Sequence, residues 1–124
     1  MINRFFVRLA VAGAFAFGGA AAAEAHAFLD HASPPVGSTV SGPLPEITLW
    51  FTEEVEPVFS GVTVTNTAGD RVDGGKVVLD PRNAQELHVA LKSLAPGEYE
   101  VHWHVVATDT HRTEGNFHFT VASR

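Results

Sequence analysis

The sequence contains no cysteine, and its only methionine is Met1. The chain therefore has no disulfide, no thiolate metal ligand and no thiol nucleophile. Basic residues are also few, with 8 Lys and Arg against 14 Asp and Glu and a formal net charge of −6. This charge disfavours nucleic acids and anionic membrane surfaces as partners and favours cations. Any bound metal ion must be held mainly by nitrogen and oxygen ligands.

The first 25 residues have the pattern of an export signal. Arg4 and Arg8 are followed by a run of small apolar residues, and residues 23–25 form the small-x-small tripeptide Ala-Glu-Ala that signal peptidase cleaves. The apolar run is shorter than the roughly 20 residues that a membrane-spanning helix needs. We therefore predict a signal peptide over residues 1–25, with cleavage after Ala25, rather than a membrane anchor.

The mature domain would comprise residues 26–124, which is enough for one domain with one hydrophobic core. It would contain no methionine, so it offers no sulfur ligand of any kind for soft copper(I). Without disulfides, its stability must come from packing.

Alternating apolar and polar residues predict an all-β fold. Turn sequences rich in glycine and proline separate the alternating runs, and no run has a helical period. With further segments near residues 27–32 and 76–79, about seven strands result, which favours a Greek-key β-sandwich of immunoglobulin-like type or a β-barrel. The expected inward-facing residues are Ile47, Leu49 and Phe51; Val62 and Val64; Leu87, Val89 and Leu91; Val101, Trp103 and Val105; and Phe117, Phe119 and Val121. Tyr99, which opens a strand just after a Pro-Gly turn, is expected to form a tyrosine corner.

His26 would become the first residue of the mature chain. It would then carry a free α-amine beside its imidazole, and the two nitrogens can close a six-membered chelate ring on one metal ion. The α-amine has an ordinary pKa near 7.7–8.0, so a metal ion displaces its proton easily at neutral pH. The alternative is that a histidine follows the cleavage site by chance.

Asp109 and His111, in the connection before the last strand, form the second candidate. In an extended segment, side chains two residues apart point the same way and can reach one ion. Alternatively, Asp109 closes a turn through its own backbone and His111 is solvated. With His26, the pair offers three nitrogens and one carboxylate oxygen, a set that suits copper(II), with zinc and nickel as competitors.

Four segments together resemble the CopC family of periplasmic copper-binding proteins, and the resemblance covers nearly the whole mature chain. These segments are HAFLDHASPPVGS, LWFTEEVEP, LAPGEYEVHWHVVATDTH and GNFHFTV. The resemblance implies a seven-stranded Greek-key β-barrel in the periplasm and one copper(II) per chain, bound by His26, Asp109 and His111. It also places Glu53 as a weak or outer ligand. The methionine-rich copper(I) loop of other family members has no counterpart here, so we expect a copper(II)-only protein.

The resemblance implies a monomeric binding protein for copper homeostasis or resistance that sequesters copper(II) or delivers it, with a CopD-like inner-membrane copper transporter as the expected partner. No catalytic apparatus is discernible, so an enzyme is not expected. Two alternatives stay open. One is a copper oxidase related to lytic polysaccharide monooxygenases, which also bind copper through an N-terminal histidine. The other is a metal-free interaction module.

The remaining histidines are expected to be solvated residues at the surface. His104 and His118 would be neighbours across the last two strands if these form a hairpin, and could make an adventitious second metal site. His88 and His102 point away from apolar neighbours, and His31 is expected either near the copper site or exposed.

Overall fold

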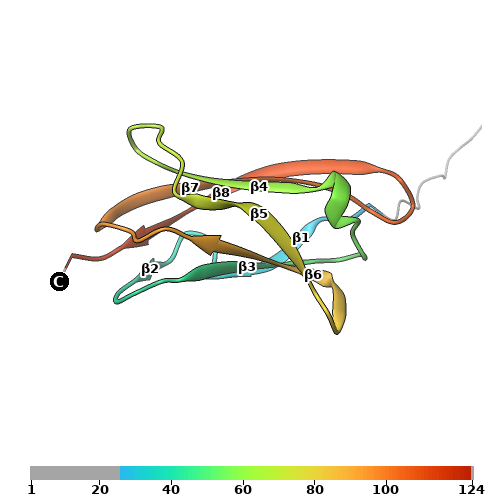
Figure 1. Ribbon diagram of the computed structural model, residues 1–124, viewed down its shortest axis with the longest axis horizontal. Helices are drawn as coiled ribbons and strands as arrows, with labels where there is room; N and C mark the ends of the chain where they lie inside the picture. Colours follow the sequence, from blue (N-terminus) through green and yellow to red (C-terminus); the bar gives the residue numbers. More distant parts are fainter. Residues whose placement is uncertain (1–25, 124) are drawn as a thin grey trace, which may run out of the picture.

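The protein is a sandwich of two four-stranded β-sheets (Figure 1). The computed structural model describes residues 26–123. The predicted signal peptide therefore lies outside the described residues. The elements are β1 (Leu29–Ser33), β2 (Thr39–Val40), β3 (Glu46–Phe51), the 3₁₀ turn η2 (Pro57–Phe59), β4 (Gly61–Asn66), β5 (Asp73–Asp80), β6 (Asn83–Leu91), β7 (Gly97–Val106) and β8 (Arg112–Val121).

The first sheet has the strand order β1-β3-β6-β5, and the second has the order β2-β8-β7-β4. All strand pairs are antiparallel except β2 with β8, which is parallel. The all-β sandwich is confirmed, with eight strands within residues 26–123 rather than about seven. The additional strand, β2, has only two residues, too few to produce a visible alternation in the sequence. Within the described residues, no helix has the length and apolar character required to cross a membrane.

The core lies between the sheets and consists of the inward-facing residues that the alternation predicts. Of the predicted set, all but Leu91, which is half-buried, have exposed fractions of 7% or less. Trp103 packs edge-on against Phe51 with ring centroids 5.2 Å apart. Its indole lies over Gly115 on the neighbouring strand, where an added Cβ would come within 2.7 Å of the ring. The Tyr99 hydroxyl donates to the carbonyl of Ala95, so the predicted tyrosine corner is present.

Asp73 links the two sheets. It lies in β5 of the first sheet and is only 3% exposed, and its Oδ1 accepts a 2.9 Å hydrogen bond from the backbone N–H of Val64 in β4 of the second sheet. Its Oδ2 accepts from the Gly75 N–H at 2.9 Å and from the Arg71 guanidinium at 2.7 Å. Burial by itself would raise the pKa of Asp73, but these hydrogen bonds and the Arg71 charge together lower it.

Because its pKa is lower in the folded state, the Asp73 carboxylate stabilises the fold above the unfolded-state pKa of about 3.9, and this contribution is lost as the pH falls through the folded-state pKa. We predict that Asp73→Asn lowers the free energy of unfolding at pH 7 by about 2 kcal/mol. The difference from wild type should shrink below about pH 4. Urea denaturation at a series of pH values measures both quantities. Asp70→Asn, at an exposed turn residue, is the matched control. An Asp73→Asn penalty that is the same at every pH would contradict this account.

Candidate metal centre

The segment that begins with His26 is held in a fixed position between the two sheets. Ala27 is completely buried, and its carbonyl accepts a 2.5 Å hydrogen bond from the hydroxyl of Thr113 in β8. Thr52, directly after β3, exchanges hydrogen bonds with Phe28: the Phe28 N–H donates to Thr52 Oγ1, and the Thr52 N–H donates to the Phe28 carbonyl, both at 2.9 Å. The Thr52 hydroxyl also donates to the His26 carbonyl at 3.3 Å. The backbone of His26 is thus attached to β3 on one side and to β8, through Ala27, on the other.

The connection between β7 and β8 is a tight turn. The Ala107 N–H donates to the His111 carbonyl at 2.9 Å, and the Thr110 N–H donates to the Ala107 carbonyl at 2.8 Å. Asp109 Oδ1 accepts a 3.1 Å hydrogen bond from the His111 N–H, and Thr110 has a φ of 76°, in the left-handed region. The assumption of an extended segment was therefore wrong. Asp109 does close a turn, and this same turn brings its carboxylate to His111.

His26, Asp109 and His111 lie together at one end of the sandwich. The rings of His26 and His111 have centroids 4.5 Å apart, and Asp109 Oδ2 lies 3.3 Å from His111 Nδ1. The pKa of Asp109 is lowered, first by the hydrogen bond from the His111 N–H, and further by the His111 side chain and the nearby His26, against a smaller opposing effect of burial. The side chains of His111 and Asp109 are 62% and 36% exposed, so an ion can reach them from solvent.

These three side chains are close, but they do not form a closed ligand shell. Among the described residues, a different group of three side chains, described below, has ligand atoms that all lie within 4.8 Å of one another. In the full chain, the nitrogen of His26 is part of a peptide bond to Ala25. Cleavage at this bond would add the α-amine and complete a set of three nitrogens and one carboxylate oxygen.

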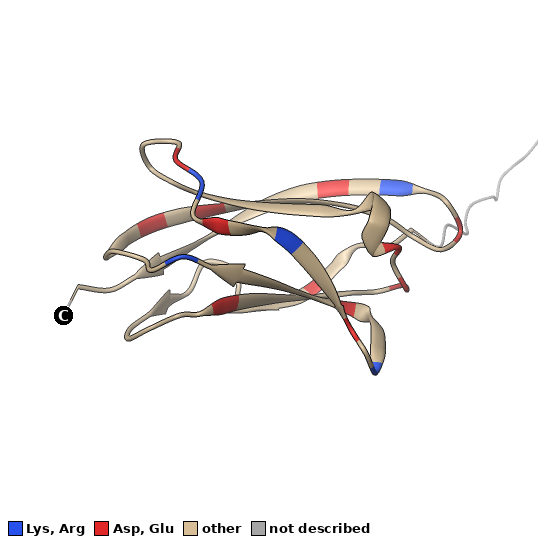
Figure 2. Cartoon of the chain, viewed as in Figure 1, with Lys and Arg blue, Asp and Glu red and all other residues tan. Residues whose placement is uncertain are grey.

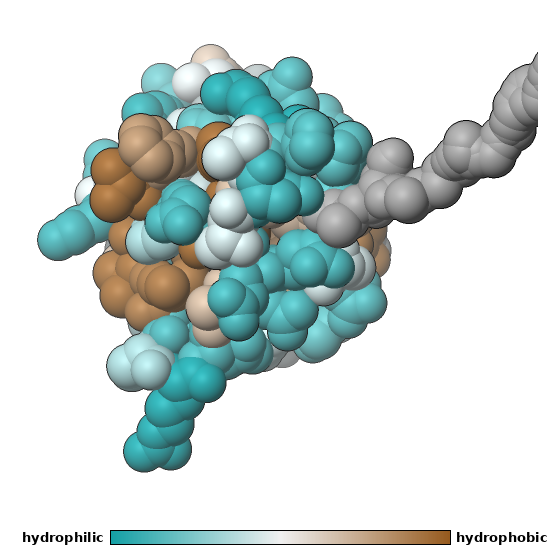
Figure 3. Space-filling model, turned by 90° about the vertical axis from the view of Figure 1, so that its right-hand side faces the viewer, coloured by the Kyte–Doolittle hydropathy of each residue, from teal (hydrophilic) through white to brown (hydrophobic). Residues whose placement is uncertain are grey.

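Acidic residues after β3 lie beside this turn. The Thr108 N–H donates to the Glu54 carbonyl at 3.1 Å, and the Glu56 N–H donates to the Val106 carbonyl at 2.8 Å. Figure 2 shows acidic positions on this connection and on the β7–β8 turn at the same end of the molecule. Figure 3, which faces this end, shows mostly hydrophilic side chains, with hydrophobic ones gathered on one side. Glu53 is exposed, and the structure shows no hydrogen bond or ion pair of its carboxylate among the described residues.

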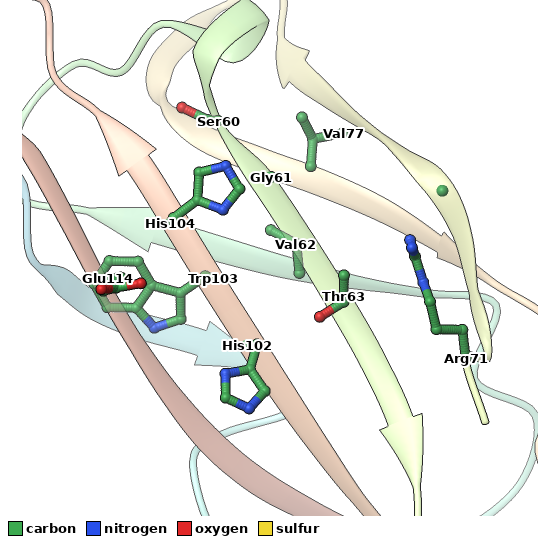
Figure 4. Close-up of a pocket in the computed structure, with 11 residues that line it drawn as sticks. Ser60, Gly61, Val62, Thr63, Arg71, Val77, His102, Trp103, His104 and Glu114 are labelled. Atoms are coloured by element: carbon green, nitrogen blue, oxygen red, sulfur yellow. The ribbon is translucent and has the colours of Figure 1, made fainter. Parts of the chain in front are cut away.

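The expected pairing of His104 with His118 is wrong. The register of β7 and β8 places His104 opposite Glu114 and His118 opposite Glu100. The strands are longer than expected and the turn between them is shorter, which shifts the register. His102 and His104 instead line a pocket of about 210 Å³ on the outer face of β4 and β7 (Figure 4).

His88 is also placed differently from the expectation of a solvated side chain, because it is only 25% exposed and is surrounded by carboxylates. Glu86 stands two residues before it on the same face of β6, and this alternation was the available sequence signal. His31 is exposed and stacks on Trp50, with ring centroids 4.3 Å apart. Sequence reasoning also missed Thr52 and Thr113, because a single hydroxyl carries no distinguishing pattern.

Comparison with known proteins finds similar sequences and structures that cover most of the described residues. The family model described as the CopC domain matches residues 29–122. Protein YobA of Escherichia coli K12 is 38% identical over 98 residues, which cover 78% of this chain and 79% of YobA. Copper resistance protein C of Xanthomonas campestris pv. juglandis is 34% identical over 116 residues, which cover 82% of this chain and 84% of that protein.

A solved structure shares the arrangement of the strands. The crystal structure of CopC from Methylosinus trichosporium OB3b superposes with a TM-score of 0.75 at 30% identity, covering 80% of this chain and 96% of that one. The match to the family model covers all of the strands described, from the start of β1 to the end of β8. The chain therefore belongs to the CopC family, whose relatives include copper resistance proteins.

Proposed function

We propose that the mature chain is a periplasmic carrier of copper(II), which it binds as one ion through the α-amine and imidazole of His26 together with Asp109 and His111. The observation that supports this most strongly is the position of the His26 ring, 4.5 Å from that of His111 and beside the turn that holds Asp109. The buried Ala27 and the hydrogen bond from the Thr52 hydroxyl to the His26 carbonyl hold the segment that carries this ring.

The chemistry of these groups favours copper(II) over other ions. Divalent copper has the highest affinity among first-row divalent ions for nitrogen and oxygen ligands, and a ring of two nitrogens from one residue suits its tetragonal geometry. The negative charge of Asp109 stabilises the divalent ion over the monovalent one. Copper(I) prefers sulfur, which the mature chain lacks. Glu53 directly follows Thr52 in the sequence, and as an outer ligand it adds negative potential near the ion.

The exposure of the site fits transfer of the ion to another protein. His111 is more than half exposed, so an incoming ligand can replace it without unfolding the domain. The relative in Xanthomonas campestris is named a copper resistance protein. We assign the same class of role to this chain, sequestering copper(II) or delivering it to an inner-membrane transporter of the CopD type, with the chain acting as a monomer and not as an enzyme.

We predict that one extra residue before His26 disrupts copper(II) binding. The added peptide bond removes the amine ligand and breaks the chelate ring, so the affinity should fall by more than the roughly 10–100-fold that loss of a supporting hydrogen-bond partner usually costs. Competition with a chromophoric chelator measures the affinity, and the electron paramagnetic resonance spectrum reports the ligand nitrogens. Equal affinity and an identical spectrum for the two forms would rule out the His26 amine as a ligand.

Matched substitutions distinguish a histidine that is a proposed copper ligand, His111, from one that is not, His104. His111→Ala should weaken copper(II) binding by more than about 100-fold, because it removes a direct ligand. His104→Ala, on the outer face of β7, should leave the affinity unchanged. Binding is measured on the mature forms by the same competition assay. A loss of affinity that is similar in both variants would place the ion elsewhere.

Thr52 is predicted to position the site without touching the ion. Thr52→Val keeps the shape of the side chain but removes two hydrogen bonds of its hydroxyl, the one accepted from the Phe28 N–H and the one donated to the His26 carbonyl. The backbone hydrogen bond from the Thr52 N–H to the Phe28 carbonyl remains. Copper(II) affinity should fall roughly tenfold, with an unchanged spectrum, because the ligands are the same but are held less firmly. Thr120→Val, on β8, is the control. Wild-type affinity in Thr52→Val would show that the backbone of His26 needs no such support.

A further inference from the structure

A second cluster of metal-ligating side chains lies on the first sheet, formed by β5 and β6. His88 Nε2 is 2.9 Å from Glu86 Oε2 and 3.2 Å from Asp80 Oδ1. One ligand atom from each residue lies within 4.8 Å of the other two. The side chains are only 17–25% exposed, so they form a partly enclosed site rather than a loose group of surface acids. No residue of this cluster belongs to the copper site proposed above.

In each carboxylate of the cluster, one oxygen faces His88, and the other accepts hydrogen bonds that fix the orientation of the group. Glu86 Oε1 accepts from Trp50 Nε1 at 2.9 Å and from the Asn83 side-chain amide at 3.4 Å. Asp80 Oδ2 accepts a 2.9 Å hydrogen bond from the Arg82 N–H. Both residues are therefore held so that the second oxygen points to His88 Nε2. A site of this kind needs little reorganisation when an ion enters.

The opposite nitrogen of the His88 ring also has partners. His88 Nδ1 is 3.2 Å from Thr48 Oγ1 and 3.5 Å from Glu46 Oε2. A proton on Nδ1 can be donated to these oxygens, which leaves the lone pair of Nε2 directed between Glu86 and Asp80. A carboxylate behind a histidine that faces an ion is the usual support for a metal-bound imidazole. Three electron-rich atoms then converge on one point, which is the arrangement that a metal ion needs.

We propose that His88 Nε2, Glu86 Oε2 and Asp80 Oδ1 bind a divalent transition-metal ion, with Zn²⁺ as the ion that fits best. One imidazole with two carboxylates is a ligand set of the type zinc uses, with a fourth position left for water. Bonds of 2.0–2.2 Å in a tetrahedral site place ligand atoms about 3.4 Å apart. The observed separations of 2.9 and 3.2 Å from Nε2 are shorter than this spacing by about 0.5 and 0.2 Å, so the side chains need to move apart only slightly to admit the ion.

The test uses the mature protein loaded first with one equivalent of copper(II), so that the His26 site is filled. Titration with Zn²⁺, followed by isothermal calorimetry, should show one zinc ion bound per chain. His88→Asn should abolish this binding, whereas His118→Asn, at an exposed histidine of β8, should keep it. Equal zinc binding by wild type and His88→Asn, or none by wild type, would overturn the proposal. The second outcome would mean that the cluster holds only a proton.

Two further variants keep the test decisive if His88→Asn does not fold, which circular dichroism would reveal. Glu86→Gln, which retains an oxygen that can accept from Trp50, should weaken zinc binding more than tenfold. Glu46→Gln should weaken it by about tenfold, because it removes the carboxylate that supports the His88 imidazole. Wild-type affinity in Glu86→Gln would overturn the proposal. His111→Ala should bind the zinc ion at this cluster as wild type does, so a failure of the copper site and a failure of the zinc site give different results.

Discussion

The burial of Ala27 is the structural constraint on which the proposed copper site depends. A buried alanine with its carbonyl bonded to Thr113 fixes the residue before it, and the two hydrogen bonds of Thr52 with Phe28 fix the residue after it. His26 therefore projects from a rigid point rather than from a free chain end. Chain termini are usually the least ordered part of a domain. Here, the terminus of the mature domain would be tied to both sheets, which lowers the entropic cost of holding a metal ion.

The turn from Ala107 to His111 complements this rigidity. Thr110 adopts a left-handed conformation, which is costly for a β-branched residue, by about 1–3 kcal/mol. The hydrogen bonds of Asp109 and Ala107 within the turn, and those of the neighbouring acidic connection, offset this cost. The result is that Asp109 and His111 face the same point before any ion is present. A strained residue between two proposed ligands is consistent with a site shaped for binding.

The two proposed metal sites use the same chemistry in different settings. Each combines imidazole nitrogen with carboxylate oxygen, which a chain without cysteine and rich in acidic residues can supply. His111 at the proposed copper site is well exposed, whereas His88 is mostly enclosed by Glu86, Asp80 and the strands around them. Exposure favours exchange of the ion with a partner, and enclosure favours retention.

The sequence by itself determined the fold class, the inward-facing residues and the tyrosine corner, because alternation and turn residues act over a few neighbouring positions. It also identified His26, Asp109 and His111 as candidates through local patterns. Only the tertiary structure decided that His26 meets His111, that Glu86 and His88 face Asp80 from the next strand, and that His104 and His118 lie apart. Those outcomes depend on strand register and on turns such as the one at Thr110, which arise from packing between segments distant in the chain.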